Sequence, residues 1–249
     1  MSVSYSFLIT SLAGLSTLLG MLVIFFSKKQ SNKIIVSSLS FAAGVMLCVS
    51  LLDLVPESVE LLTQNYSNLA SILFFGIFLS IGVLVSMFID SKMPDNNKEH
   101  SKLFRVGIIS MFAIILHNIP EGIATFMASS IDKKLGISLA LAIAMHNIPE
   151  GISISVPIYY STKSKKKSFM YTFISALSEP FGALIAFFFL KDLITDSFMG
   201  MLFAFIAGIM THISFYELLP EAKSYNDNKL SSIFFIIGII FMSVNHLIF

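Results

Sequence analysis

Hydrophobic residues in this chain occur in long runs, without the alternation expected of the strands and amphipathic helices of a soluble domain. A helix crosses the hydrocarbon core of a bilayer with about 20 mostly apolar residues. Eight runs qualify, covering residues 6–26, 34–55, 69–89, 105–128, 136–158, 169–190, 198–219 and 231–248. The short connections between them hold nearly all the charge. The pattern predicts an all-α membrane protein with eight transmembrane helices, in which residues 1–249 form a single transmembrane domain.

Composition supports this interpretation. Hydrophobic residues make up 55% of the chain and charged residues 12%, whereas a soluble domain carries about 25% charged residues. The net charge of +1 gives no basic surplus for nucleic acid, and Cys48, the single cysteine, excludes an internal disulfide. The first run lacks a preceding Lys or Arg and is followed by Lys28 and Lys29. This is the reverse of a secretory signal, so we expect a retained first span.

The lysines and arginines predict the orientation of the helices. Loops on one side of the predicted membrane hold thirteen of the sixteen: Lys28, Lys29, Lys33, Lys92, Lys98, Lys102, Arg105, Lys163, Lys165, Lys166, Lys167, Lys223 and Lys229. The opposite side holds only Lys133, Lys134 and Lys191. Cytoplasmic loops carry the excess of Lys and Arg. With eight spans, both termini are therefore predicted to lie outside the cytoplasm.

A six-residue motif occurs twice. Residues 117–122 read His-Asn-Ile-Pro-Glu-Gly, and residues 146–151 repeat this sequence letter for letter. The two copies lie near the middles of the fourth and fifth predicted spans. Since consecutive helices joined by a short loop run antiparallel, the copies are expected to face each other at a similar depth.

A second, looser repeat relates the second and seventh spans. Residues 41–46, Phe-Ala-Ala-Gly-Val-Met, resemble residues 205–210, Phe-Ile-Ala-Gly-Ile-Met. At the same offset, residues 53–57 (Asp-Leu-Val-Pro-Glu) resemble residues 217–221 (Glu-Leu-Leu-Pro-Glu). The two spans are predicted to run in opposite directions. This arrangement is typical of the inverted-topology repeats of secondary transporters, and it predicts a 3+2+3 arrangement of the eight spans.

Carboxylates in the middle of predicted spans point to a bound cation. His and Glu are four apart within each motif, and Asn and Glu three apart, so these side chains share one helical face. Glu179, followed by Pro180, adds a third acid in the sixth span. A charged acid at the bilayer centre costs about 2.5–3.5 kcal/mol, and every Lys and Arg lies in a loop or at a span end. Protonation, water or an external cation must therefore neutralise the acids, and the neighbouring His and Asn favour the cation.

The residue types indicate which cation binds. Carboxylate and amide oxygens combined with imidazole nitrogens suit zinc, iron(II), manganese and cobalt, whereas calcium and magnesium take oxygen ligands alone. Without a thiolate in the set, copper(I) is disfavoured. Two glutamates on facing helices could each bridge two ions, which would make the site binuclear.

With these residues considered together, the chain resembles the ZIP (Zrt/Irt-like) metal transporters, and within them the bacterial ZupT type. The resemblance covers the whole chain and rests on the doubled His-Asn-x-Pro-Glu-Gly motif. It implies an eight-helix fold with both ends outside the cytoplasm and import through a site between the fourth, fifth and sixth spans. The loop between the third and fourth spans has only His100, so regulation through a histidine-rich loop is not expected.

The resemblance also implies the ligand sets. One metal site would consist of Asn118, Glu121, Asn147, Glu150 and Glu179. The adjacent site would consist of Glu121, His146 and Glu150, together with His117. The second-span methionine of the family corresponds to Met46.

Four residues outside the central site are candidates for the metal pathway: Met46, Asp53, His212 and Glu217. Met46, Asp53 and Glu217 each have a simpler interpretation. Core packing is the more common role for a methionine such as Met46, and acids near span ends, such as Asp53, Glu57, Glu217 and Glu221, are readily solvated. His246, at a helix end, is assigned no role.

The sequence thus predicts import of divalent transition-metal ions, zinc and iron(II) first and manganese and cobalt further, across the bacterial cytoplasmic (inner) membrane. Zn²⁺ and Fe²⁺ are transported ions, and no prosthetic group is expected. The expected partners are these ions and the lipid bilayer, with a homodimer as a candidate assembly. The alternative is an intramembrane zinc-dependent hydrolase, since a His and a Glu four apart on a helix also occur in zinc enzymes. A symmetric excess of ligands suits passage better than retention, so we expect no enzyme. A metal sensor would need a soluble output domain, which is not expected here.

Overall fold

The computed structural model describes residues 2–26, 31–92, 99–189 and 195–248. These residues form helices joined by short connections, and eight helical segments are long and apolar enough to cross a membrane: Val3–Phe26, Asn32–Thr63, Asn68–Lys92, Lys102–Ile131, Lys133–Thr162, Lys165–Phe189, Asp196–Ser224 and Asn228–Ile248. The predicted all-α class and the eight spans are therefore confirmed. Lys28, Lys29, Lys98 and Lys191, used above to predict the orientation, lie outside the described residues.

Four of the eight spans are uninterrupted helices: α5 (Asn68–Lys92), α6 (Glu99–Ile131), α7 (Lys133–Thr162) and α12 (Asn228–Ile248). The first span consists of α1 (Val3–Leu15), the 3₁₀ segment η1 (Ser16–Met21) and α2 (Leu22–Phe26). The second consists of α3 (Asn32–Val49), the π-helical turn η2 (Ser50–Leu54) and α4 (Val55–Thr63). The sixth consists of α8 (Lys165–Ala176) and α9 (Ser178–Phe189), and the seventh of α10 (Asp196–Ile213), the π-helical turn η3 (Ser214–Leu218) and α11 (Leu219–Ser224).

The second and seventh spans extend further than predicted, to Thr63 and Ser224 instead of 55 and 219. The predicted ends stop just before Pro56 and Pro220. In the structure each proline lies in the first turn of the helix that follows a π-helical turn. Proline is tolerated there because the first-turn N–H groups have no partner within their own helix.

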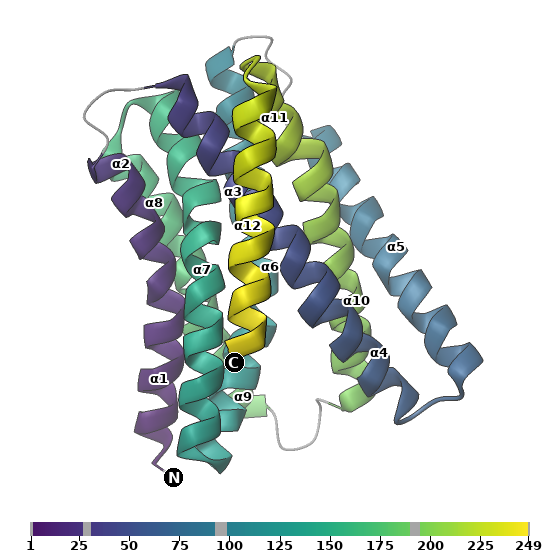
Figure 1. Cartoon of the computed structure of the whole chain (residues 1–249). Coiled ribbons are helices and arrows are strands. Elements are labelled where there is room, and N and C mark those ends of the chain that lie inside the picture. The colour runs from purple at the N-terminus through teal and green to yellow at the C-terminus, as the bar shows by residue number, and fades with distance from the viewer. Residues whose placement is uncertain (1, 27–30, 93–98, 190–194, 249) are drawn as a thin grey trace.

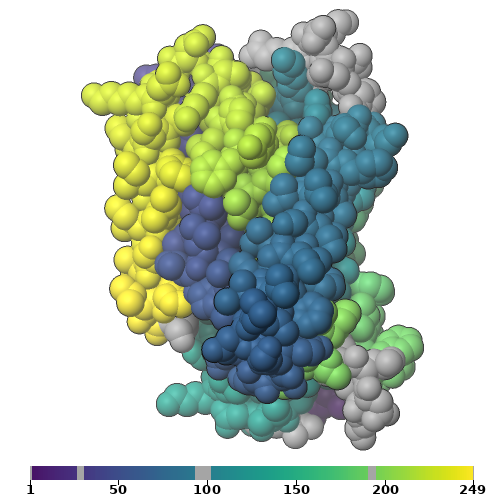
Figure 2. Space-filling view, turned by 90° about the vertical axis from the view of Figure 1, so that its right-hand side faces the viewer, coloured from purple at the N-terminus to yellow at the C-terminus, as the bar shows by residue number. Residues whose placement is uncertain are grey.

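The spans pack as two groups. The first, fourth, fifth and sixth spans contact one another through α1, η1, α6, α7, α8 and α9, whereas α3 packs against α12 and α10 packs against α5. Contacts of α3 with α7 and of α10 with α6 join the groups (Figure 1). Helix α5 lies on the outside of the bundle (Figure 2), and Ser71, Gly82 and Ser86 are its buried residues. Its remaining surface is largely apolar, as expected of a helix that faces lipid.

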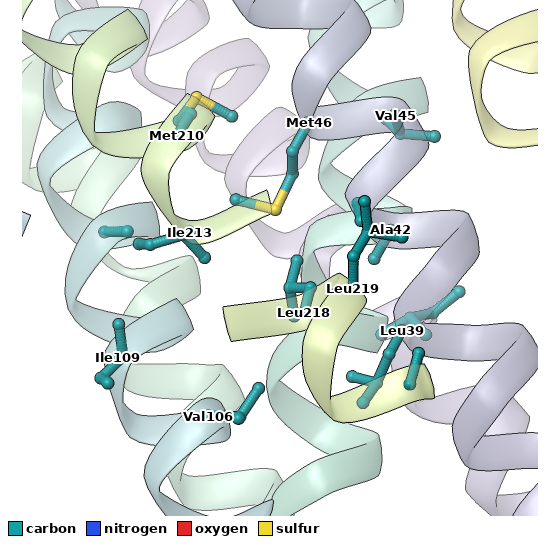
Figure 3. Packing of buried hydrophobic residues seen from close by; sticks show 14 of the residues in the cluster. Leu39, Ala42, Val45, Met46, Val106, Ile109, Met210, Ile213, Leu218 and Leu219 are labelled. Atoms are coloured by element: carbon teal, nitrogen blue, oxygen red, sulfur yellow. The ribbon is translucent and has the colours of Figure 1, made fainter. Parts of the chain in front are cut away.

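The largest hydrophobic core joins the two groups. Leu39, Met46, Ile109 and Met210 lie in it together with residues of η3 and α11 (Figure 3). Met46 and Met210 are both fully buried. Met46 thus packs in the core in this conformation, and its role in the metal pathway stays a prediction.

Both chain ends point to the same end of the bundle. Helix α1 starts and α12 finishes toward the lower end in Figure 1, whereas α3 starts and α11 finishes at the upper end. The span α3–η2–α4 therefore runs antiparallel to the span α10–η3–α11.

Candidate metal site

The two copies of the six-residue motif meet where α6 and α7 lie side by side. His146 Nε2 lies 2.8 Å from Glu121 Oε1, which is a hydrogen bond between the two helices. His117 Nε2 lies 3.1 Å from Glu121 Oε1 and 3.5 Å from Glu150 Oε1. Each histidine therefore lies close to a glutamate of the other copy.

The sixth span contributes Glu179 through a break in its helix. Helix α8 ends at Ala176, and α9 starts at Ser178 with Glu179 in its first turn. Pro180 lacks the N–H that would continue the α8 hydrogen-bond ladder, and a carboxylate is favourable at a helix N-terminus. Asn147 of α7 donates its amide to Glu179 Oε1 and to the carbonyl of Ala13, at 3.1 Å for the latter. The third acid is thereby connected to α7.

The glycine of each motif lets another span approach closely. A Cβ atom on Gly122 would overlap the backbone of Glu179, and one on Gly151 would overlap the carbonyl of Thr17. Gly122 thus brings α9 against α6, and Gly151 brings η1 against α7. Each motif therefore carries candidate ligands, together with a glycine that lets a neighbouring span pack beside them.

All seven predicted central residues are buried: His117, Asn118, Glu121, His146, Asn147, Glu150 and Glu179. Several of their polar atoms have no hydrogen-bond partner, including both oxygens of Glu150, both polar atoms of Asn118, and Oε2 of Glu121 and Glu179. A buried polar group without a partner costs about 1–3 kcal/mol. Within the described part of the chain, the ion-pair contacts of Glu121 and Glu150 are with histidines alone. The cluster therefore has donor atoms that a cation could use.

The geometry suits a transition metal. One ligand atom each from His117, Glu121 and His146 lie within 4.8 Å of one another. Nitrogen and carboxylate ligands at such spacing match the preferences of zinc and related ions. Asn147 and Glu179 form a second group beside α9. Glu150 lies next to the first group, since its Oε1 is 3.5 Å from His117 Nε2.

A cavity of about 590 Å³ leads to this cluster and is lined by Glu121 and His146. Asp53 and Glu57 line it too, as do Asn245 and His246 of α12. Asp53, predicted as a pathway residue, thus lines the same cavity as Glu121 and His146, and its role in the pathway stays a prediction. Sequence reasoning assigned no role to His246 because it lies at a helix end; its partner Asp53 is 193 positions away and belongs to another span.

The other predicted pathway residues lie elsewhere. His212 Nδ1 is 2.9 Å from Ser86 Oγ, and the His212 ring stacks on Tyr216. Glu217 is buried and lies near Asp90 of α5. Neither His212 nor Glu217 lines the cavity that reaches Glu121.

Comparison with known proteins identifies the family. The sequence model of the ZIP zinc transporters matches residues 91–246. A zinc transporter ZupT from Chlorobaculum parvum is 41% identical over all of this chain and 98% of its own length. ZupT proteins from Streptococcus mutans and Clostridium perfringens are 41% and 38% identical, over 98% and 100% of this chain and 97% of their own lengths. The resemblance seen in the doubled motif therefore extends over the whole sequence, and the chain belongs to the ZIP family of zinc transporters.

Proposed function

We propose that this chain imports zinc and related divalent ions across the bacterial cytoplasmic membrane. The observation that carries the proposal is the buried cluster of three glutamates, two asparagines and two histidines on α6, α7 and α9. The ion itself would neutralise these carboxylates while it crosses the membrane. Zinc is the first substrate because relatives along the full length are named zinc transporters. Iron(II), manganese and cobalt are the further substrates in this proposal, because the mixed oxygen and nitrogen donors suit them.

Two ions would bind next to each other in this cluster. His117 and His146 would hold the first ion together with Glu121 and Glu150. Asn118, Asn147 and Glu179 would hold the second, sharing the same two glutamates. The 3.1 Å and 3.5 Å contacts of His117 with Glu121 and Glu150 support this arrangement, since they place both glutamates beside one imidazole.

Matched helix crossings support a 3+2+3 inverted repeat. Where α3 crosses α12, Gly44 and Gly238 each face the carbonyl three residues before the other glycine. Where α10 crosses α5, Gly208 and Gly82 likewise each face the carbonyl three residues before the other glycine. The π-helical turns η2 and η3 begin six residues after Gly44 and Gly208, respectively. Two equivalent helix pairs of opposite direction suit a transporter that opens alternately to either side.

The direction of transport follows from the charge of the loops. The lysine-rich loops would be cytoplasmic, so both termini and the mouth of the cavity beside α4 would face outward. Ions would reach Glu121 and His146 from outside through this cavity. A homodimer is the candidate assembly, and chemical cross-linking in native membranes would detect it.

Nothing favours the hydrolase alternative. The matched relatives are named transporters, and this family consists of carriers, not enzymes. A catalytic zinc is held by three fixed ligands with one open position, whereas this cluster offers more donors than one ion requires.

Uptake by the purified protein tests the proposal. We expect proteoliposomes that contain a zinc-sensitive dye to accumulate zinc in a saturable manner, with iron(II) and cobalt as competitors. Calcium and magnesium should compete poorly, because they prefer sites built of oxygen alone. Uptake equal to that of protein-free liposomes would contradict the proposal, and stoichiometric zinc binding without uptake would favour the hydrolase alternative.

A further inference from the structure

A contact between two distant spans lies at the mouth of the cavity. His246, near the end of α12, places Nδ1 2.6 Å from Asp53 Oδ1 of η2. Both side chains are partly exposed, at 47% and 32% of their side-chain surface. An exposed pair of this kind adds little to stability, so its position beside the cavity is the more informative property.

The contact fixes how the imidazole is presented. A carboxylate accepts the hydrogen bond here, so His246 donates through Nδ1–H and Nε2 is the ring nitrogen left for a metal ion. Histidines that bind metals characteristically donate their other ring N–H to a carboxylate, which sets the tautomer and makes the free nitrogen more basic. Asp53 thus gives His246 the orientation of a metal ligand.

The surroundings of the pair are suited to a cation. Glu57 and Glu60 of α4 line the same cavity, so three carboxylates lie around its mouth. Further in, Asn245 is buried and donates its amide to the carbonyl of Ala142 at 3.3 Å. The Asn245 oxygen Oδ1 is buried without a hydrogen-bond partner, and this residue also lines the cavity. A buried amide oxygen without a hydrogen-bond partner is a second, independent indication that a ligand binds in the cavity.

The same spacing from a crossing glycine occurs in both helix pairs, α3 with α12 and α10 with α5. His246 follows Gly238 by eight residues, and Asp90 follows Gly82 by eight residues in the equivalent helix pair. Asp53 and Glu217 each follow their crossing glycine by nine residues. The pair of η2 and α12 thus corresponds to Glu217 of η3 and Asp90 of α5, which lie near each other. Of these two pairs, only the one at the cavity combines a histidine with a carboxylate.

We propose that His246, oriented by Asp53, is an outer binding site that captures a divalent transition-metal ion and passes it to Glu121 and His146. Glu57 and Glu60 attract the ion, and the oxygen of Asn245 provides an intermediate ligand along the cavity. A site with only a few ligands suits this role, since an ion on a conduction path must bind well enough to enter and weakly enough to leave. The inference rests on the proposed function and adds a site to it.

Transport kinetics test the outer site. We expect His246→Ala to raise the KM for zinc about tenfold, the loss typical of weakened metal ligation, while the maximal rate changes less than twofold. His246→Gln keeps a side-chain donor for Asp53 but lacks the imidazole, so it should behave like His246→Ala. If the contact only anchors α12, His246→Gln would behave like the wild type and the proposal would be wrong. Asp196→Asn removes an exposed acid from the start of α10, away from the cavity lining, and should leave the KM unchanged.

A binding measurement separates this proposal from the proposed function. In the purified full-length double variant Glu121→Gln/Glu150→Gln, calorimetry with zinc should still detect weak binding, and adding His246→Ala should remove one weak site from it. The absence of that site, or its persistence after His246→Ala, would overturn the outer site even if the wild type transports zinc. A wild type that binds zinc at this site but does not transport it would overturn only the proposed function.

Discussion

At the scale of single residues, the central cluster depends on contacts between the two motif copies. Glu121 Oε1 lies 2.8 Å from His146 of the facing helix and 3.1 Å from His117 of its own helix. Asn147 is directed to Glu179 of a third helix. A set of buried donors from three helices can surround an ion, whereas one helical turn presents its side chains from one side only.

Asn118 is the residue most suited to set metal preference, because both its polar atoms are buried without a partner. We expect Asn118→Ala to lower iron(II) uptake more than zinc uptake. Its hard amide oxygen helps iron(II), while zinc tolerates a nitrogen-rich set. Competition assays would give the ratio of the two rates. Ser110→Ala, a buried change two turns away on α6, is the packing control, and an unchanged iron-to-zinc ratio in Asn118→Ala would count against a ligand role.

The seven central residues could be predicted from sequence because the motif occurs twice, and because acids without nearby Lys or Arg are costly in a membrane. The family resemblance grouped Glu121 with His146, but the spacing of the residues alone did not specify which side chains would be in contact across the helices. The pairing of Glu121 with His146 depends on the rotation of α6 against α7, which periodicity does not specify. The contact of Asp53 with His246 joins residues 193 positions apart, and no local pattern relates two such positions.

At the scale of elements, apolar length predicted every span, and the interruptions within spans escaped prediction. The 3₁₀ segment η1, the π-helical turns η2 and η3, and the break at Leu177 all lie inside continuous apolar runs. Hydrophobicity is the same for each of these geometries, so it cannot distinguish them. π-helical turns are frequent at functional sites, and η2 carries Asp53.

The close approach of α9 to α6 at Gly122 is testable. We expect Gly122→Ala to lower stability by about 1–3 kcal/mol through overpacking and to reduce zinc uptake, because the new methyl group would displace the backbone of Glu179. Thermal unfolding in detergent and uptake in proteoliposomes would measure both effects. Gly76→Ala is the matched control, since a Cβ there meets nothing within 4 Å. Equal stability and uptake for the two variants would contradict the packing role of Gly122.

At the scale of the whole molecule, eight spans place both chain ends on one side of the bundle (Figure 1). The hydrophobic pattern predicted this even number, while the packing of the spans into two groups came from the structure alone. That grouping depends on small residues at helix crossings, such as Gly44 with Gly238. A glycine in an apolar run predicts close contact without identifying the partner.

Reporter fusions would test the orientation in the membrane. A reporter inserted at residues 163–167 should read as cytoplasmic, and one attached to Phe249 as external, because the lysine-rich loops are expected inside. A cytoplasmic signal at Phe249 would require an odd number of spans in the membrane and would contradict the inverted repeat.

The central claim is that buried carboxylates carry the metal ion through the membrane, and Glu150→Gln tests it most directly. The side chain of Glu150 is fully buried and both its oxygens lack a hydrogen-bond partner. Glutamine keeps its shape and removes its charge. At matched amounts of reconstituted protein, we predict that zinc uptake falls to less than about a tenth of the wild-type rate, the scale of loss that weakened metal ligation causes. Uptake at the wild-type rate would contradict the account.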